Sequence, residues 1–373
     1  MTELPAGRPE LVERIRTEIL AGGPISFARF MEIALHDPEH GYYAGGPARL
    51  GRSGDFFTAS DVGPAFGAAL AHQLDEMDRA LGRPAPFRYV EVGAGRGWLA
   101  RDVLDAWEDA RGRVRTTLVD SSRGMREAAA ARVPEARVCA SAREESGGAG
   151  AVIAVELLDA LPVHRVRRTG HALAEVRVAV EGTALREVEA PAGTEVAAWA
   201  AAYGLAPEDG DEAEVCLALG PAIRELASIL DRGFVVVVDY GHDAARLAAR
   251  AHRRGTLLAY HRHAVHERYL ERVGEQDLTA HVNLTALARE AERAGLRTLG
   301  TTTQDRFLVA NGLLQGLDEA GEGAGAVKRR LQAKQLIHPD GMGRAFKVAI
   351  FSKGIEPAPA LRGLKDPFGG GAR

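Results

Sequence analysis

Three glycines at alternating positions follow an apolar run in residues 88–97, and they constrain the fold more than any other feature. The stretch RYVEVGAGRG predicts a strand, a turn containing Gly93, Gly95 and Gly97, and the start of a helix. Such a strand–turn–helix opens a doubly wound α/β sheet, and its glycines let the backbone approach a nucleoside closely. A dinucleotide-binding turn would need a glycine at position 98, where the chain has Trp98. A purely structural glycine turn is the alternative.

The next predicted strand ends in a carboxylate, Asp120. In nucleotide-binding α/β folds an acidic residue at this place accepts hydrogen bonds from ribose hydroxyls, and its distance from the glycines suits that role. No Lys-Ser or Lys-Thr pair follows the glycines, so a triphosphate ligand is not expected. Together the two features favour an adenosyl ligand, whereas a solvated aspartate at a strand end is the alternative.

Composition excludes several classes of protein. The 373 residues carry a net charge of −4, which gives no overall attraction to nucleic acid or anionic lipid. The two cysteines show neither disulfide nor zinc spacing, and His261, His263 and His266 lack accompanying carboxylates, so no metal is expected. No signal pattern and no run of about 18 apolar residues occurs, which predicts a cytoplasmic protein without a membrane span.

The predicted elements place two additions around one sheet. Alternating residues between 164 and 180 predict a β-hairpin, and four valines before Asp239 predict a central strand buried on both faces. The segment 181–215 is expected to be irregular, and 316–327 and 354–373 to be mobile. The predicted strands are 88–92, 114–120, 136–140, 150–155, 233–239, 296–302 and 345–351, with helices at 8–36 (broken by Gly-Gly-Pro), 64–81, 97–110, 122–132, 221–231 and 284–294.

This order predicts a core with a cap. The N-terminal segment and the insertion should cover the carboxyl ends of the strands, where ligands of open α/β sheets bind. The expected parts are a helical and loop segment (1–82), the first half of the core (83–163), an inserted hairpin or cap (164–220), the second half of the core (221–353, with a loop insertion at 255–283) and a flexible tail (354–373).

Two acidic residues directly follow the fourth predicted core strand. Glu156 and Asp159 lie three positions apart, where a carboxylate pair would suit a cationic acceptor such as a guanidinium group. The alternative is a Glu156 that caps the following turn and an Asp159 that is merely exposed. Further polar clusters nominate Tyr43, Asp239, Tyr240, His263 and His281 as substrate-binding candidates, with a neutral imidazole as a potential general base.

The glycine turn, preceded by Glu91, resembles the first motif of S-adenosylmethionine (SAM) methyltransferases, and longer motifs resemble the MidA family. The matching segments are ISFARFMEIALHDPEHGYY (25–43), GRSGDFFTASDVGPAFG (51–67), VEVGAGRG (90–97), VELLDALPV (155–163), VVVVDYG (235–241), RGTLLAY (254–260), QDLTAHVN (276–283), TQDRFL (303–308) and HPDGMGRAFKV (338–348). The family has many bacterial members, and its characterised eukaryotic member methylates protein arginines.

The resemblance implies a class I methyltransferase fold: a Rossmann-like seven-stranded sheet with an N-terminal helical segment and an inserted cap. It implies SAM as cofactor and assigns roles to matching residues. Glu156 and Asp159 lie at the methyl-transfer edge. The cofactor-binding residues are Glu91, Gly93, Gly95, Gly97, Asp120, Ser121, Gly54, Thr58 and Ser60, of which the last three belong to a loop that closes over the methionine portion.

Three positions depart from the family pattern: Val155 replaces an asparagine, Asn283 an aspartate, and Trp98 a small residue. The leading hypothesis is methylation of a protein arginine. A small-molecule O- or N-methyltransferase of secondary metabolism, and a SAM-binding assembly factor without turnover, are the alternatives. No nucleic-acid or membrane partner is expected, and a homodimer is compatible with the sequence.

Overall fold

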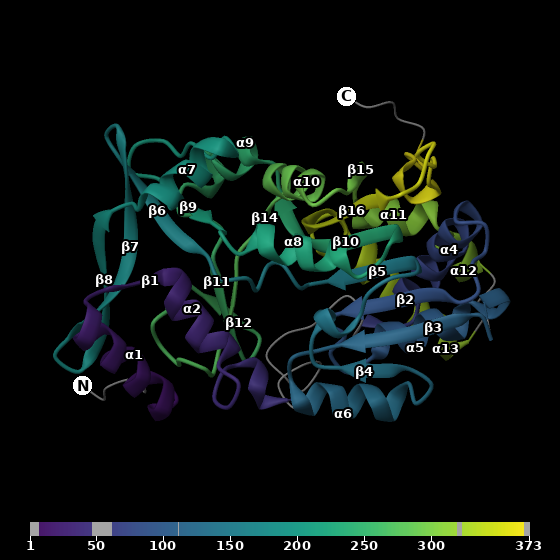
Figure 1. Cartoon of the computed structure of the whole chain (residues 1–373), viewed down its shortest axis with the longest axis horizontal. Coiled ribbons are helices and arrows are strands. Elements are labelled where there is room, and N and C mark those ends of the chain that lie inside the picture. Colours follow the sequence, from purple (N-terminus) through teal and green to yellow (C-terminus); the bar gives the residue numbers. More distant parts are fainter. Residues whose placement is uncertain (1–6, 47–61, 111, 319–322, 369–373) are drawn as a thin grey trace. The chain divides into compact units, whose positions relative to one another are not determined.

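The computed structural model describes residues 7–46, 62–110, 112–318 and 323–368 (Figure 1). The chain forms two compact units. We call them the core unit (residues 57–157, 223–240 and 291–373) and the accessory unit (residues 1–56, 158–222 and 241–290). Within the described ranges, no helix combines the length and apolar character that a membrane crossing requires.

The core unit is built on a seven-stranded sheet, which confirms the predicted α/β class. The strands lie in the order β15-β16-β10-β5-β2-β3-β4, and β14 adds a short pairing at the end of β10. Strands β10, β5, β2, β3 and β4 run parallel, whereas β16 is antiparallel to both of its neighbours. Figure 1 shows β5, β2, β3 and β4 side by side. The bounds are β2 (Phe87–Val92), β3 (Val114–Val119), β4 (Arg137–Cys139), β5 (Ala149–Val155), β10 (Arg232–His242), β14 (Val282–Asn283), β15 (Arg297–Thr303) and β16 (Phe346–Lys353).

Apolar side chains of this sheet pack against helices to form one large core. Phe87 and Val236 of the sheet are fully buried there, together with Phe66 and Phe307 from two of the helices. The run of valines in β10 is buried on both faces, as its sequence predicted. The helices that contribute to this core are α4 (Ala65–Ala80), α5 (Trp98–Ala106), α6 (Arg123–Arg132), α11 (Gln304–Ala310), α12 (Leu313–Asp318), α13 (Ala324–Ile337) and α14 (Met342–Ala345). Two further helices, α8 (Leu219–Ser228) and α10 (Leu284–Arg293), contain residues of both units.

The accessory unit has its own sheets and its own cores. A sheet of order β1-β7-β6-β9, with β8 paired to β7, lies in the same unit as a three-stranded sheet of order β12-β11-β13. Ser26 accepts a hydrogen bond from the Arg29 N–H and caps the start of α2. The bounds are α1 (Pro9–Gly22), β1 (Ile25–Ser26), α2 (Phe27–His36), η1 (Tyr43–Gly45), β6 (His164–Thr169), β7 (Ala172–Glu181), β8 (Ala184–Pro191), α7 (Thr194–Ala202), β9 (Glu212–Val215), α9 (Ala244–Leu247), η5 (Arg250–His252), β11 (Leu258–His261), β12 (Ala264–His266) and β13 (Asp277–Thr279).

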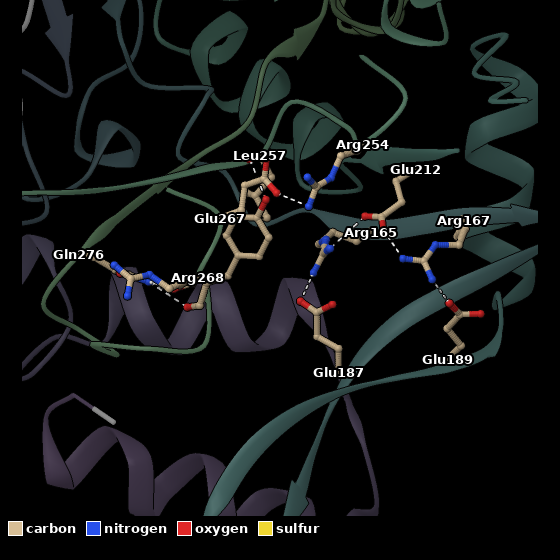
Figure 2. Close-up of polar contacts among 11 residues, drawn as sticks. Arg165, Arg167, Glu187, Glu189, Glu212, Arg254, Leu257, Glu267, Arg268 and Gln276 are labelled. Carbon is tan, nitrogen blue, oxygen red and sulfur yellow. Dashed lines mark hydrogen bonds and ion pairs between the residues drawn. The ribbon is translucent and has the colours of Figure 1, made fainter. Parts of the chain in front are cut away.

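A row of ion pairs crosses the accessory sheet (Figure 2). Arg165 pairs with Glu187 and Glu212, and Arg167 pairs with Glu189 and again with Glu212. The guanidinium of the buried Arg165 also lies over an aromatic ring of α2. A buried guanidinium is tolerated only when its charge is paired and its hydrogen bonds are made, so this row fixes the register of β6, β8 and β9.

Two sequence predictions about order were wrong. Residues 181–215 are not irregular, because β8, α7 and β9 occupy most of that segment. The segment 354–368 is not a mobile tail: Leu361 is buried, and the Gly363 N–H donates to the Gln73 side chain of α4. A Cβ at Gly363 would lie 2.4 Å from that Gln73 oxygen, so only a glycine allows the segment to pack this closely against α4. The Gly- and Pro-rich composition of the segment does not reveal this packing.

Candidate active site

The glycine turn after β2 forms an open cradle of backbone. Gly93, Gly95 and Gly97 have φ angles of 75°, 52° and 71°, in the left-handed region that favours glycine. A Cβ at Gly93 would lie 3.0 Å from the Leu157 side chain, whereas one at Gly95 would meet no described residue within 4 Å. Among the described residues the turn therefore leaves free space beside Gly95, which suits a ligand that lies directly against the backbone.

Asp120, at the end of β3, holds this turn in place. One carboxylate oxygen accepts from the Gly95 N–H at 2.9 Å, and the other accepts from the Ser122 N–H at 2.8 Å. Burial raises the pKa of this carboxyl, and the two backbone donors oppose the rise. Each oxygen keeps a further lone pair, so the predicted ribose contact fits the geometry. Ser121 is exposed beside it, and its carbonyl accepts from Arg126.

Glu91, near the end of β2, is a buried carboxyl. The Tyr89 hydroxyl donates to it at 2.8 Å. Burial raises its pKa to about 8, and the nearby Asp120 adds to the rise. At neutral pH the group is therefore largely protonated, and a cation placed beside it would favour its ionised form.

The turn after β5 carries Glu156 in an unusual conformation. Its φ of 51° is left-handed, which is uncommon for a residue other than glycine, and its N–H donates to the Val238 carbonyl at 2.9 Å. The next residue, Leu157, donates its N–H to the Asp239 carboxylate at 3.2 Å. Asp239 is 2% exposed and also accepts from the Tyr240 N–H. Backbone strain of this kind is concentrated at functional sites.

Asp239 and Tyr240 were predicted to contact substrate. The structure gives Asp239 a definite role in holding the turn at Leu157, while the Tyr240 ring packs against Phe346 with centroids 3.9 Å apart and ring planes 36° apart. Substrate contact by either residue stays a prediction.

A second group of polar side chains lies in the accessory unit. The Tyr43 hydroxyl donates to Asp277 at 2.9 Å, and the carboxylates of Asp277 and Asp159 both raise the pKa of Tyr43, after burial as the main cause. Asp159 is 3% exposed, and its carbonyl accepts from the Ala280 N–H at 2.9 Å. The structure thus brings the predicted Tyr43 and Asp159 together with a residue that sequence reasoning missed, Asp277.

His36 is a second missed neighbour. Its ring stacks on that of Tyr43 with centroids 5.5 Å apart, and its Nε2 lies 3.0 Å from the Ala160 carbonyl. Burial lowers the pKa of His36, which favours the neutral imidazole. The segments ALHDPEHGYY and QDLTAHVN offered many polar residues, and only the contact between distant segments selects Asp277 and His36.

The two histidine candidates lie elsewhere in the accessory unit. His263 is exposed in the turn between β11 and β12, with a left-handed φ of 63°. His281 donates its N–H to the Thr256 hydroxyl, and its ring lies 5.4 Å from that of His242. Their roles in substrate binding stay predictions, as do those of Gly54, Thr58 and Ser60, which lie outside the described residues.

The departures from the family pattern have structural explanations at two positions. Trp98 is 41% exposed, and the Arg132 guanidinium lies 3.5 Å above its ring, so the indole is held at the surface. The Asn283 side chain accepts from the Ala286 N–H and caps α10, a role that asparagine and aspartate fill equally well. Val155 is half-buried and packs against the large core.

Comparison with known proteins identifies the family. A family model for S-adenosyl-L-methionine-dependent methyltransferases, Methyltransf_28, matches residues 69–302. The human protein arginine methyltransferase NDUFAF7 of mitochondria is 29% identical over 382 residues, covering 92% of this chain and 83% of its own. The rat protein of the same name is 29% identical over 374 residues, covering 90% and 83%.

A solved structure extends the match to the whole fold. A Burkholderia thailandensis protein, described as a "likely methyl transferase" and bound to S-adenosyl-homocysteine, is 32% identical, and the match covers 97% of both chains with a TM-score of 0.87. The free space at Gly95 and the remaining acceptor capacity of Asp120 fit such a nucleoside. This chain belongs to the MidA-like Methyltransf_28 family of class I methyltransferases, and its cofactor is SAM.

Proposed function

We propose that this enzyme methylates a guanidinium nitrogen of an arginine in a protein. The observation that carries the proposal is the turn at Glu156. This residue directly follows β5, has a left-handed φ, and is held by the hydrogen bond from its N–H to the Val238 carbonyl of β10; the segment that begins with it leads to Asp159. The names of the curated relatives support the same acceptor. In the accessory unit, Asp159, Asp277 and Tyr43 add negative charge and hydrogen-bonding capacity.

A guanidinium acceptor needs two things from the enzyme. It stays protonated throughout the physiological pH range, so its charge must be held away from the reacting nitrogen, and one nitrogen must be aimed along the line of attack. Carboxylates in a fixed geometry satisfy both needs, because they accept paired hydrogen bonds from the planar group. Glu156 and Asp159 are the residues that we assign to this task.

Bound SAM supplies an electrophilic methyl carbon and a neutral thioether leaving group. Transfer to an arginine nitrogen would leave the electron pair of the S–C bond on sulfur and one surplus proton on that nitrogen. The acceptor nitrogen then loses one proton, to a neighbouring carboxylate or to water. The contribution of Glu156 and Asp159 is alignment and charge complementarity, which are the main sources of rate enhancement in such a displacement.

The E156Q variant tests this assignment. Glutamine keeps the shape of the side chain but removes its charge, so we expect E156Q to bind S-adenosyl-homocysteine normally and to lose methyl transfer by at least about 100-fold. Calorimetric titration and a radiolabel transfer assay measure the two properties. E127Q, on the exposed face of α6, is the matched control and should behave as the wild type. Normal transfer by E156Q would remove Glu156 from the mechanism.

The acceptor itself can be identified directly. The enzyme is incubated with methyl-labelled SAM and a lysate of the source organism, and the labelled protein is hydrolysed to amino acids. We expect the label in methylated arginine and its absence with E156Q. Label found only in small molecules, or on another amino acid, would contradict the arginine proposal while leaving the enzyme a methyltransferase.

A further inference from the structure

Three arginines gather on one face of the core sheet, at the edge opposite the glycine turn. Arg88 is the second residue of β2, Arg115 is the second residue of β3, and Arg137 begins β4. The register places Arg88 opposite Arg115, and Arg137 opposite Thr117, two residues beyond Arg115. Because side chains alternate between the faces of a strand, all three arginines project from the same face.

The charges in this group are incompletely balanced. Glu145, whose side chain is 3% exposed, pairs with both Arg88 and Arg137, while Arg88 also donates to the Gly147 carbonyl. Arg115 is exposed and makes no ion pair or side-chain hydrogen bond with any residue that the structure describes. Like charges directly opposite each other destabilise a sheet. Burial, and then Arg115 and Arg137, lower the pKa of Arg88.

A cavity of about 300 Å³ opens beside these side chains. Such a volume is at the lower end of the range for small-molecule sites. A Cβ at Gly148 would lie 2.9 Å from Cδ of Arg88, so the Arg88 side chain can line the cavity only because residue 148 is a glycine. The lining contains three guanidinium groups and two carboxylates. The lining residues are Arg88, Arg115, Arg137, Glu144, Glu145, Ser146, Gly147 and Gly148.

We propose that this cavity binds a phosphate dianion, either free or as the phosphomonoester of a small molecule, with Arg115 as its principal ligand. Guanidinium groups donate paired hydrogen bonds to phosphate oxygens, and an anion here would offset the repulsion between neighbouring strands. The site lies within the core unit at the amino ends of β2, β3 and β4, whereas the glycine turn follows the carboxyl end of β2. It is therefore separate from the cofactor site.

Calorimetric titration of the full-length protein tests the proposal, at constant ionic strength set with sodium chloride. Inorganic phosphate and glycerol 3-phosphate are the probes, and glycerol is the uncharged control. We expect saturable binding of one phosphate group per chain. The R115E variant should weaken that binding by at least about tenfold, and R115K, which keeps the charge but loses the paired donors, by a smaller factor. R123E, which makes the same charge change at an exposed position of α6, should leave it unaltered.

The arms of the titration separate the possible outcomes. Tighter binding of glycerol 3-phosphate than of phosphate would identify a phosphomonoester as ligand, and equal binding would identify the free ion. Normal binding of S-adenosyl-homocysteine by R115E would show that the core unit is folded, so that a loss of phosphate binding is local. Absence of saturable phosphate binding by the wild type, or equal affinity in R115E and R123E, would overturn the proposal.

Discussion

Gly95 combines a left-handed backbone with open space among the described residues around it. Its φ of 52° makes any other residue costly there, and no described residue lies within 4 Å of a Cβ added to it. We expect G95A to lose about 1 kcal/mol of unfolding free energy. The added methyl group would occupy the space that the cofactor needs, so we also expect affinity for S-adenosyl-homocysteine to fall by at least about 100-fold.

Gly82 provides the matched control for that prediction. Its φ is 79°, and no residue that the structure describes lies within 4 Å of an added Cβ. G82A should therefore show a similar loss of stability in urea denaturation with unchanged cofactor affinity. If G95A and G82A bind the cofactor equally well, the ligand does not lie against Gly95.

Glu91 makes the free energy of unfolding fall as the pH rises, whereas most native carboxyls make it rise. Its native pKa of about 8 exceeds the ordinary value of 4.5 because the group is buried. Between these pH values the folded state keeps a proton that the unfolded state releases. This group therefore lowers the free energy of unfolding as the pH rises from about 5 to about 8.

The E91Q variant should remove this dependence. Glutamine resembles the protonated acid and can still accept from Tyr89. Relative to the wild type, we expect E91Q to gain on the order of 3 kcal/mol of unfolding free energy between pH 5 and pH 8.5. Urea denaturation across this range measures the difference, with E127Q as control. Parallel stability curves for E91Q and the wild type would contradict the raised pKa.

At the scale of elements, patterning predicted the core sheet well. Periodic apolar runs gave seven strands close to their observed bounds, since the central strands are buried and lie between turn residues. The helices α11, α12 and α13 were missed. The apolar residues of α13 do not recur on one helical face, so periodicity gave no signal there. The glycines and alanines of 316–327 misled the prediction for that segment, since α13 already begins at Ala324.

The candidate site was predictable only where its residues follow a strand. The glycines, Asp120 and Glu156 come directly after predicted strands, where position alone indicates a role. Asp277 is different, since its partner Tyr43 lies 234 positions away in the chain. No local pattern encodes such a pairing, which depends on how η1 and β13 fold together.

The pairing of η1 with β13 should matter for turnover. Asp277 accepts from Tyr43 and lies near enough to Asp159 for both carboxylates to act on the same hydroxyl. We expect D277N to lower kcat/KM for the methyl acceptor by at least about tenfold, because it removes charge that a guanidinium would require. Affinity for S-adenosyl-homocysteine should stay unchanged.

Two further variants refine this test. Y43F should have a smaller effect than D277N, because it removes a hydrogen bond and leaves both carboxylates. D209N, whose side chain accepts from the exposed Gly170 N–H, is the control in the same unit and should behave as the wild type. Unaltered acceptor kinetics in D277N would show that Asp277 only supports local structure.

At the scale of the whole molecule, each unit has hydrophobic clusters of its own. A large cluster around Val236 belongs to the core unit, whereas a cluster that contains Val178 belongs to the accessory unit. The members of each of these two clusters lie within a single unit. We therefore expect each unit to unfold locally with its own free energy, although the chain alternates between the units along its sequence.

Hydrogen exchange should reveal this division. Val178 of β7 and Val236 of β10 are both fully buried, so V178A and V236A should each cost about 1–3 kcal/mol. We expect V178A to speed amide exchange about 10- to 100-fold in β6 and β7 while leaving β5 as in the wild type, and V236A to do the reverse. Bound S-adenosyl-homocysteine should slow exchange in residues 92–99 of both variants. Equal acceleration of β5 and β7 by V178A would mean that the two sets of cores open as one cooperative structure.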